Sequence, residues 1–274
     1  MSMALEFRAV SVCHADGTRA LDEVRFTVPA GQFCVVLGPS GAGKSTLLRT
    51  VNGLTPVTGG EVLVGGERVE VRTLNRLRRR MGMIHQNFGL SARATVATNM
   101  MAGAAASMPL WRTLTGIYTD ADKAAACALI REVGLEEAHL ARRAEQLSGG
   151  QQQRVGIARA FMPRVGQPGT SAQGPAVVLA DEPVASLDPR AAEDIVTLLH
   201  RQARERGTTV LCSLHQLDLA RRFADRIVAL SAGRVVFDGT PAQLHAAEVV
   251  AIYHHGQTAP NVPTPDALSL GAAA

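Results

Sequence analysis

The chain has 274 residues, of which 46% are hydrophobic, 4% are aromatic and 19% are charged. Such a composition excludes a disordered or fibrous protein and favours a globular α/β fold with a substantial core. Lys and Arg number 28 against 24 Asp and Glu, and this small excess requires neither a nucleic acid nor an anionic membrane as a partner.

The cysteines and the apolar runs bear on where the protein works. Cys13, Cys34, Cys127 and Cys212 show no CxxC spacing, so we expect reduced thiols in a reducing compartment and no structural metal. The opening MSMALEFRAV does not read as a secretion signal, and no run reaches the ~18 apolar residues of a membrane-spanning helix. If the protein works at a membrane, we expect a partner to hold it there.

The first predicted elements surround a glycine-rich loop, GPSGAGKST. Short β-rich runs predict strands at residues 4–10, 23–28 and 33–37. A helical pattern follows the loop at residues 44–52 and ends at Gly53. We expect further strands at residues 61–64, 68–71 and 82–85.

A basic helix is predicted at residues 74–80, where the chain reads RLRRR from 76 to 80. No aromatic residues interleave with this run, which favours a solvated helix face over a nucleic-acid or membrane site. From residue 95 to 147 the β signal disappears. Ala-rich stretches, the clearest at residues 120–133, indicate a helical insertion within an α/β protein.

The second half returns to alternating strands and helices. Apolar runs predict strands at residues 176–180, 208–212 and 227–230. Helical patterns at residues 189–206 and 217–224 separate them, which is typical of buried parallel strands. Residues 163–175 are rich in Pro, Gly and Ser and should form a surface loop, and the tail after residue 257 should be poorly ordered.

The glycine-rich loop satisfies the pattern G-x-x-x-x-G-K-[ST] between a buried-type strand and a helix, the context that separates a P-loop from an ordinary turn. Its glycines let the backbone wrap round a β-phosphate, Lys44 adds charge towards the β- and γ-phosphates, and the Ser45 hydroxyl ligates Mg²⁺. The predicted nucleotide contacts are Gly38, Pro39, Ser40, Gly41, Ala42, Gly43, Lys44, Ser45 and Thr46.

A pair of acids follows the apolar run VVLADEP, at the end of a strand where ligands of open α/β sheets gather. Asp181 is suited to holding Mg²⁺ through water, and Glu182 to polarising the water that attacks the γ-phosphorus. The pair taken alone could equally be a helix cap. The P-loop beside it favours the catalytic interpretation.

The stretch LSGGQQQR, residues 147–154, predicts a second anion site. Ser148, Gly149 and Gly150 open a predicted helix, and the free N–H groups and positive dipole end of a helix N-terminus favour a phosphate. One chain therefore carries two phosphate-binding groups about a hundred residues apart.

Together with IHQNFGL, SLD and SLHQ, these motifs occur in the order typical of the ATP-binding subunits of ABC transporters, which the chain resembles from about residue 5 to 252. The resemblance implies a P-loop NTPase (ABC ATPase) core with an antiparallel β subdomain and an inserted helical subdomain. The domain would cover residues 5–255, with the helical subdomain at about 88–150 and a disordered tail at 256–274.

The resemblance also implies roles for single residues. Gln86 would lie near Mg²⁺ and at the hinge to the transporter, His215 would bond the γ-phosphate, and Asp188 would belong to the D-loop, SLD. Two copies would pack head to tail, so that Ser148, Gly149 and Gly150 of one meet the ATP held by Lys44 of the other. His14 stands where the family usually has an aromatic ring that stacks on adenine, and it offers a smaller stacking area.

Three stretches, SMPLWRTLTGIYT, LADEPVASLDP and SLHQLDLARRFADRIVAL, resemble the ATP-binding subunits of bacterial phosphonate importers. This implies an ATPase and translocase at the cytoplasmic face of the inner membrane, with a permease and, indirectly, a periplasmic binding protein as partners and no nucleic acid. Trp111 would face the permease or, alternatively, anchor the core of the helical subdomain.

Other functions stay open. The cargo could be an amino acid or another small anion. An ABC ATPase acting on ribosomes or DNA is disfavoured, because the chain has neither a second P-loop nor sustained heptads. A non-catalytic cassette is disfavoured because Glu182 and His215 are both present.

Overall fold

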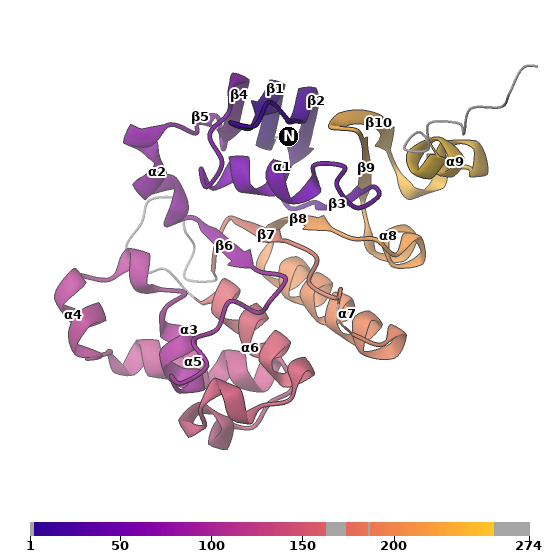
Figure 1. Cartoon of the computed structure of the whole chain (residues 1–274). Coiled ribbons are helices and arrows are strands. Elements are labelled where there is room, and N and C mark those ends of the chain that lie inside the picture. Colours follow the sequence, from indigo (N-terminus) through magenta and orange to yellow (C-terminus); the bar gives the residue numbers. More distant parts are fainter. Residues whose placement is uncertain (1–2, 163–173, 186, 255–274) are drawn as a thin grey trace, which may run out of the picture.

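The computed structural model describes residues 3–162, 174–185 and 187–254, and these residues form two sheets with helices between and around them (Figure 1). A four-stranded antiparallel sheet has the order β2-β1-β4-β5. Its strands are β1 (Met3–Cys13), β2 (Arg19–Pro29), β4 (Gly59–Val64) and β5 (Glu67–Arg68). This sheet confirms the expected antiparallel subdomain.

A six-stranded sheet carries the order β10-β9-β3-β8-β7-β6. The five strands from β9 to β6 pair in parallel, and β10 adds an antiparallel edge. The strands are β3 (Phe33–Leu37), β6 (Met81–Ile84), β7 (Val177–Ala180), β8 (Thr209–Ser213), β9 (Arg226–Ser231) and β10 (Arg234–Gly239). Every residue of β3, β7 and β8 is buried, which explains why these strands read as continuous apolar runs.

Nine α-helices occur in the described part of the chain, and four of them, α3 to α6, follow one another between β6 and β7. They are α1 (Lys44–Val51), α2 (Val71–Arg78), α3 (Val96–Met101), α4 (Leu110–Thr115), α5 (Asp120–Glu132), α6 (Gly149–Phe161), α7 (Pro189–Arg206), α8 (Leu217–Phe223) and α9 (Ala246–His254). Helices α3 to α6 gather at the β6 edge of the sheet, at the lower left of Figure 1.

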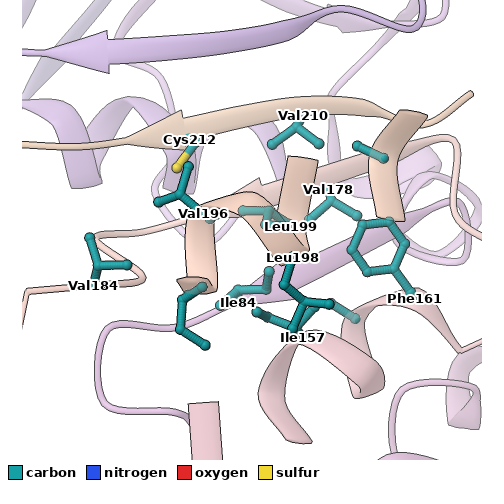
Figure 2. Packing of buried hydrophobic residues seen from close by; sticks show 14 of the residues in the cluster. Ile84, Ile157, Phe161, Val178, Val184, Val196, Leu198, Leu199, Val210 and Cys212 are labelled. Carbon is teal, nitrogen blue, oxygen red and sulfur yellow. The ribbon is translucent and has the colours of Figure 1, made fainter. Parts of the chain in front are cut away.

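The two faces of the parallel sheet belong to two cores. Alternate side chains such as Cys34 and Val36 of β3 pack with α1 and the antiparallel sheet, so α1 lies between the two sheets (Figure 1). Their neighbours, such as Val35, pack with α6 and α7 on the opposite face. Figure 2 shows this second core, where Phe161 and Ile157 of α6 meet Val178 of β7. The alternation follows from the two-residue period of a strand.

One predicted strand is wrong at its end. Residues 68–71 were expected to be β, whereas β5 stops at Arg68 and Val71 begins α2. Glu70 and Thr73 form a reciprocal cap at the start of this helix, in which the Glu70 N–H donates to Thr73 Oγ1 over 3.1 Å. The cap satisfies N–H groups at the helix start and so decides for helix over strand. The predicted basic helix at 74–80 consequently begins and ends earlier, as α2.

Most of the surface loop expected at residues 163–175, and the tail expected at 256–274, lie outside the described residues. The other predicted strands and helices differ from the observed ones by a few residues at their ends. Helices α3 and α4 lie within the helical insertion expected at residues 95–147, whereas the sequence patterns did not predict β10 or α9.

Candidate functional site

The glycine-rich loop joins β3 to α1 and can be formed only by glycine at two of its positions. Gly38 has φ +149°, and a Cβ there would lie 2.3 Å from the Leu230 carbonyl oxygen. Gly43, the N-cap of α1, has φ +100°, and its Cβ would lie 2.4 Å from the Ala20 oxygen. These close approaches press the loop against the neighbouring backbone and leave the α1 N-terminus free to face a phosphate.

Lys44 lies over this loop and is 4% exposed. Its Nζ donates to the carbonyl oxygens of Gly38 and Pro39, both at 2.9 Å, and lies 3.7 Å from Glu182 Oε1. Burial lowers the pKa of the Lys44 ammonium, against the charges of Glu182 and Asp181, which act to raise it. The loop therefore concentrates one positive charge beside two acids.

Asp181 follows β7 and meets the first turn of α1. Its Oδ1 accepts from Ser45 Oγ at 2.8 Å and from Ser213 Oγ at 3.2 Å, and the residue is 4% exposed. Hydroxyl and carboxylate oxygens are the donors that Mg²⁺ prefers, and this ion usually takes only one or two protein groups beside the phosphates of a substrate. The described residues hold no cluster of three or more His, Cys, Asp or Glu side chains that would bind a metal by themselves. The Ser45 and Asp181 pair thus fits a nucleotide-bound Mg²⁺.

Glu182, which follows β7, contacts one residue after each of the two neighbouring strands, β6 and β8. Its Oε1 lies 2.5 Å from His215 Nε2, after β8, and its Oε2 accepts from Gln86 Nε2 at 3.2 Å, after β6. Parallel strands bring their carboxyl ends to one edge of the sheet, so these three side chains converge although 129 positions separate Gln86 from His215. Glu182 has φ +46°, an uncommon backbone conformation for a side chain of this size.

Ser213, the last residue of β8, is a site residue that the sequence interpretation missed. Its buried hydroxyl accepts from the Glu182 N–H at 2.8 Å and donates to Asp181 Oδ1. It therefore fixes the backbone of one acid and the carboxylate of the other. The only signal in the sequence is a polar residue that ends the apolar run TVLCS and is also the first residue of SLHQ.

The segment LSGGQQQR, residues 147–154, forms the start of α6 and is called the signature segment below. Ser148 is the N-cap, where its Oγ accepts from the Gln151 N–H at 3.3 Å and Gln151 Oε1 accepts from the Ser148 N–H at 3.0 Å. A Cβ added at Gly150 would meet nothing within 4 Å, and one at Gly149 would meet only Phe88, at 3.8 Å. This helix end is open to a ligand. The contacts of Ser148 are separate from those of Lys44, so the chain presents two distinct candidate phosphate sites.

Two other predicted residues occupy different settings. Asp188 is the N-cap of α7, where its Oδ1 accepts from the N–H groups of Arg190 and Ala191 at 3.1 and 3.0 Å. Its neighbour Ser186 in the predicted D-loop lies outside the described residues. His14 is exposed in the turn between β1 and β2, closed by the bond from its N–H to the Thr18 oxygen at 2.9 Å.

The helical region presents apolar side chains to solvent around α4. Leu110, Trp111, Leu114 and Ile117 are between 54% and 77% exposed, and we call them the α4 patch. The alternative that Trp111 anchors a core is therefore wrong. The Arg112 guanidinium covers part of its ring, 5.3 Å from the centroid. An α4 patch of this kind is typical of an interaction surface.

Beside this region a cleft of about 410 Å³ lies where β6 meets the last turn of α6 and the residues that follow α3. Leu54, Met83, His85, Ala106 and Arg159 contribute to its lining. His85 directly precedes Gln86, so the cleft and the Glu182 cluster are joined through one short segment. No helix within the described residues is long and apolar enough to cross a membrane.

The family model described as "ABC transporter" matches residues 21–185, a span that runs from β2 through the P-loop and α6 to the Asp181 and Glu182 pair. This chain belongs to the ABC transporter family. It is an ATP-binding cassette, with the P-loop NTPase core expected from its motifs.

Relatives of the cassette agree with this assignment. It is 53% identical to "Phosphonates import ATP-binding protein PhnC" of Hyphomonas neptunium, over 85% of this chain and 86% of the relative. A protein of the same name from Thiobacillus denitrificans is 45% identical over 91% and 92%.

Two solved structures resemble the cassette in fold. CbiO1 of Clostridium perfringens, described as part of an ABC transporter complex, has a TM-score of 0.73 and 25% identity, over 92% of this chain and 94% of that one. The cassette MJ0796, solved as a dimer bound to ADP and Pi, has a TM-score of 0.70 and 31% identity, over 86% and 98%.

Proposed function

We propose that this cassette hydrolyses ATP to drive the import of phosphonates through a membrane permease. The observation that supports it best is the convergence of Glu182, His215 and Gln86 beside Lys44 and the Ser45 and Asp181 pair. The assignment of phosphonates as the cargo rests on the names of the relatives, which are 53% and 45% identical to this chain. Recognition of the cargo itself would belong to the permease and a periplasmic binding protein.

In the proposed reaction the P-loop N–H groups and Lys44 hold the β- and γ-phosphates. Mg²⁺, held by Ser45 and through Asp181 and Gln86, would neutralise charge on these phosphates. Glu182 orients the attacking water and accepts its proton, and His215 keeps the Glu182 carboxylate in place and bonds the γ-phosphate. When ATP enters, Lys44 exchanges the carbonyls of Gly38 and Pro39 for phosphate oxygens.

Two cassettes would complete the reaction centre. The open N-terminus of α6, with Ser148, Gly149 and Gly150, would close over the ATP bound by the P-loop of a second copy, and Asp188 would lie at the joint. The dimeric structure of MJ0796 supports this arrangement. The dimer would close when ATP binds and open after hydrolysis, and this movement would drive transport.

The helical region would pass this motion to the permease. We assign residues 88–150 to that subdomain within a domain of residues 5–255. The α4 patch lies on the subdomain, and the cleft beside His85 lies along its border with the sheet and adjoins the segment of Gln86. The cassette would thus attach peripherally to the cytoplasmic face of the inner membrane. His14 would stack on adenine over a smaller area than an aromatic ring.

The test is ATP hydrolysis by the cassette reconstituted with its permease and binding protein in vesicles. Methylphosphonate in the lumen that faces the binding protein should stimulate kcat several-fold, whereas glutamine should not. Stimulation by an amino acid instead would overturn the cargo assignment. A hydrolysis rate that neither compound changes would overturn the coupling of ATP hydrolysis to transport.

A further inference from the structure

The last described helix, α9, is packed onto the main core at the far edge of the sheet. Ile252 is fully buried in the same cluster as β3 and β8, and the half-buried Tyr253 packs against that cluster. Arg221 of α8 donates to the Leu244 oxygen at 2.9 Å, and the His245 N–H donates to Glu248 Oε2 at 3.0 Å. The helix is therefore fixed to α8 at its entrance and capped. Figure 1 shows α9 beside β10, well away from the helical region.

From this position Tyr253 reaches the segment that carries His215. Its hydroxyl donates to the His215 carbonyl oxygen at 3.3 Å. The segment runs from the end of β8 to Leu217 at the start of α8. Leu214, just before it, is tied to β3 through its N–H and the Val36 oxygen at 3.1 Å. The tyrosine thus holds the peptide that follows His215, just after the last residue of this segment that bonds to β3.

We propose that Tyr253 is a positioning residue for His215. The hydrogen bond to the His215 carbonyl limits rotation of the His215 backbone. Such a rotation would move the imidazole away from Glu182, whose Oε1 lies 2.5 Å from His215 Nε2. Burial raises the pKa of Tyr253 above its ordinary value, so at neutral pH the phenol keeps its proton and remains a donor. Tyr253 itself touches neither the P-loop nor the acids.

The proposal rests on the proposed ATPase function and predicts a selective kinetic change in Tyr253→Phe. The ring and its packing remain, and only the donor is lost. A neutral hydrogen bond of this kind changes the ratio of correctly placed to displaced His215 by roughly three- to ten-fold. We therefore expect kcat to fall about three- to ten-fold. KM for ATP should stay within about two-fold, because the P-loop contacts are untouched.

A double-mutant cycle separates this role from a merely structural one. In a His215→Ala background, Tyr253→Phe should cause no further loss of kcat, because the residue it positions is gone. Tyr118→Phe is the matched control: it removes the hydroxyl of the chain's other tyrosine, also partly buried against the same core. It should leave kcat at the parent value. An equal loss in both backgrounds, or none in the first, would overturn the proposal.

Hydrogen exchange provides a readout that needs no ATPase activity. Amides of residues 213–217 should exchange faster in full-length Tyr253→Phe and at the parent rate in Tyr118→Phe. Unchanged exchange in both would overturn the proposal. Failure of the ATPase function would instead show as a parent chain that never hydrolyses ATP, with the exchange difference still present.

Discussion

Glu182 is the residue on which the site depends most. Its carboxylate accepts from Gln86 and contacts His215 at opposite oxygens, and its backbone N–H is held by Ser213. Such fixation keeps a carboxylate in one orientation, as a general base requires, and it accounts for a positive φ that no local pattern explains.

Glu182→Gln should retain ATP binding and lose turnover by about 10²- to 10⁴-fold, because the amide keeps the shape and hydrogen-bonding reach of the side chain but cannot accept a proton. Single-turnover hydrolysis and a nucleotide-binding titration measure the two effects. Asp194→Asn, at an exposed position of α7, serves as a control of equal charge change. Turnover near the parent value in Glu182→Gln would remove Glu182 from the role of base.

His85 makes stability depend on pH. Burial, and then the charge of Arg159, lower its pKa below the ordinary 6.5. The unfolded chain therefore binds a proton at a higher pH than the folded one, and the His85 contribution to stability is lost as pH falls from about 7 through 6.5 towards the lowered value. Burial lowers the pKa of His200 as well, so part of the loss belongs to that residue.

We expect His85→Gln to reduce the slope of unfolding free energy against pH between about 7.5 and 5.5. Urea unfolding at a series of pH values measures it. His245→Gln, at an exposed position before α9, should keep the parent slope. A slope that is equal in parent and His85→Gln would contradict this expectation.

At the scale of elements, the two phosphate-binding groups are two helix starts with different caps. α1 begins at a glycine, Gly43, with no side-chain cap, so its N–H groups face outward into the loop. α6 begins at Ser148, which caps the helix itself. In the proposed dimer, the first group would bind the phosphates of its own chain's ATP, and the second would meet the ATP held by another chain.

Ser148→Arg should abolish ATP-driven dimerisation and leave ATP binding by the monomer near normal, since its bulk fills the surface that a second copy would approach. Light scattering in the Glu182→Gln background, with and without ATP, provides the measurement. Glu145→Arg, exposed three residues before Ser148, is the control for an added arginine. A Ser148→Arg chain that still dimerises on ATP would refute the shared site.

The α4 patch is best understood at the scale of the whole molecule. Its four large apolar side chains, all within eight positions, are exposed to solvent, although Leu129 and Ile130 of α5 are buried. A folded chain that keeps such a surface in water gains nothing from it by itself. Such a patch is typical of an interaction surface, and we propose the permease as the partner that covers it.

Trp111→Ser combined with Leu114→Ser should weaken assembly with the permease by at least about ten-fold while changing Tm and the ATPase rate of the free cassette little, because both side chains are exposed. Co-purification and a binding titration with the permease in detergent measure this. Val71→Ser, at a 90% exposed apolar position on α2, is the matched control. Undiminished assembly would show that the α4 patch serves another purpose.

The sequence alone determined the P-loop, the acid pair, the signature helix start and the buried parallel strands. Each is a local pattern whose meaning depends on a few neighbouring residues: the glycines with positive φ, the N-cap and the continuous apolar run. Only the tertiary structure decided that Gln86, Glu182 and His215 meet, that Ser213 links the acids, that Trp111 faces outward and that Tyr253 reaches His215. These contacts join residues 31 to 96 positions apart or depend on which face of a helix packs, and the tertiary fold rather than local preference determines them.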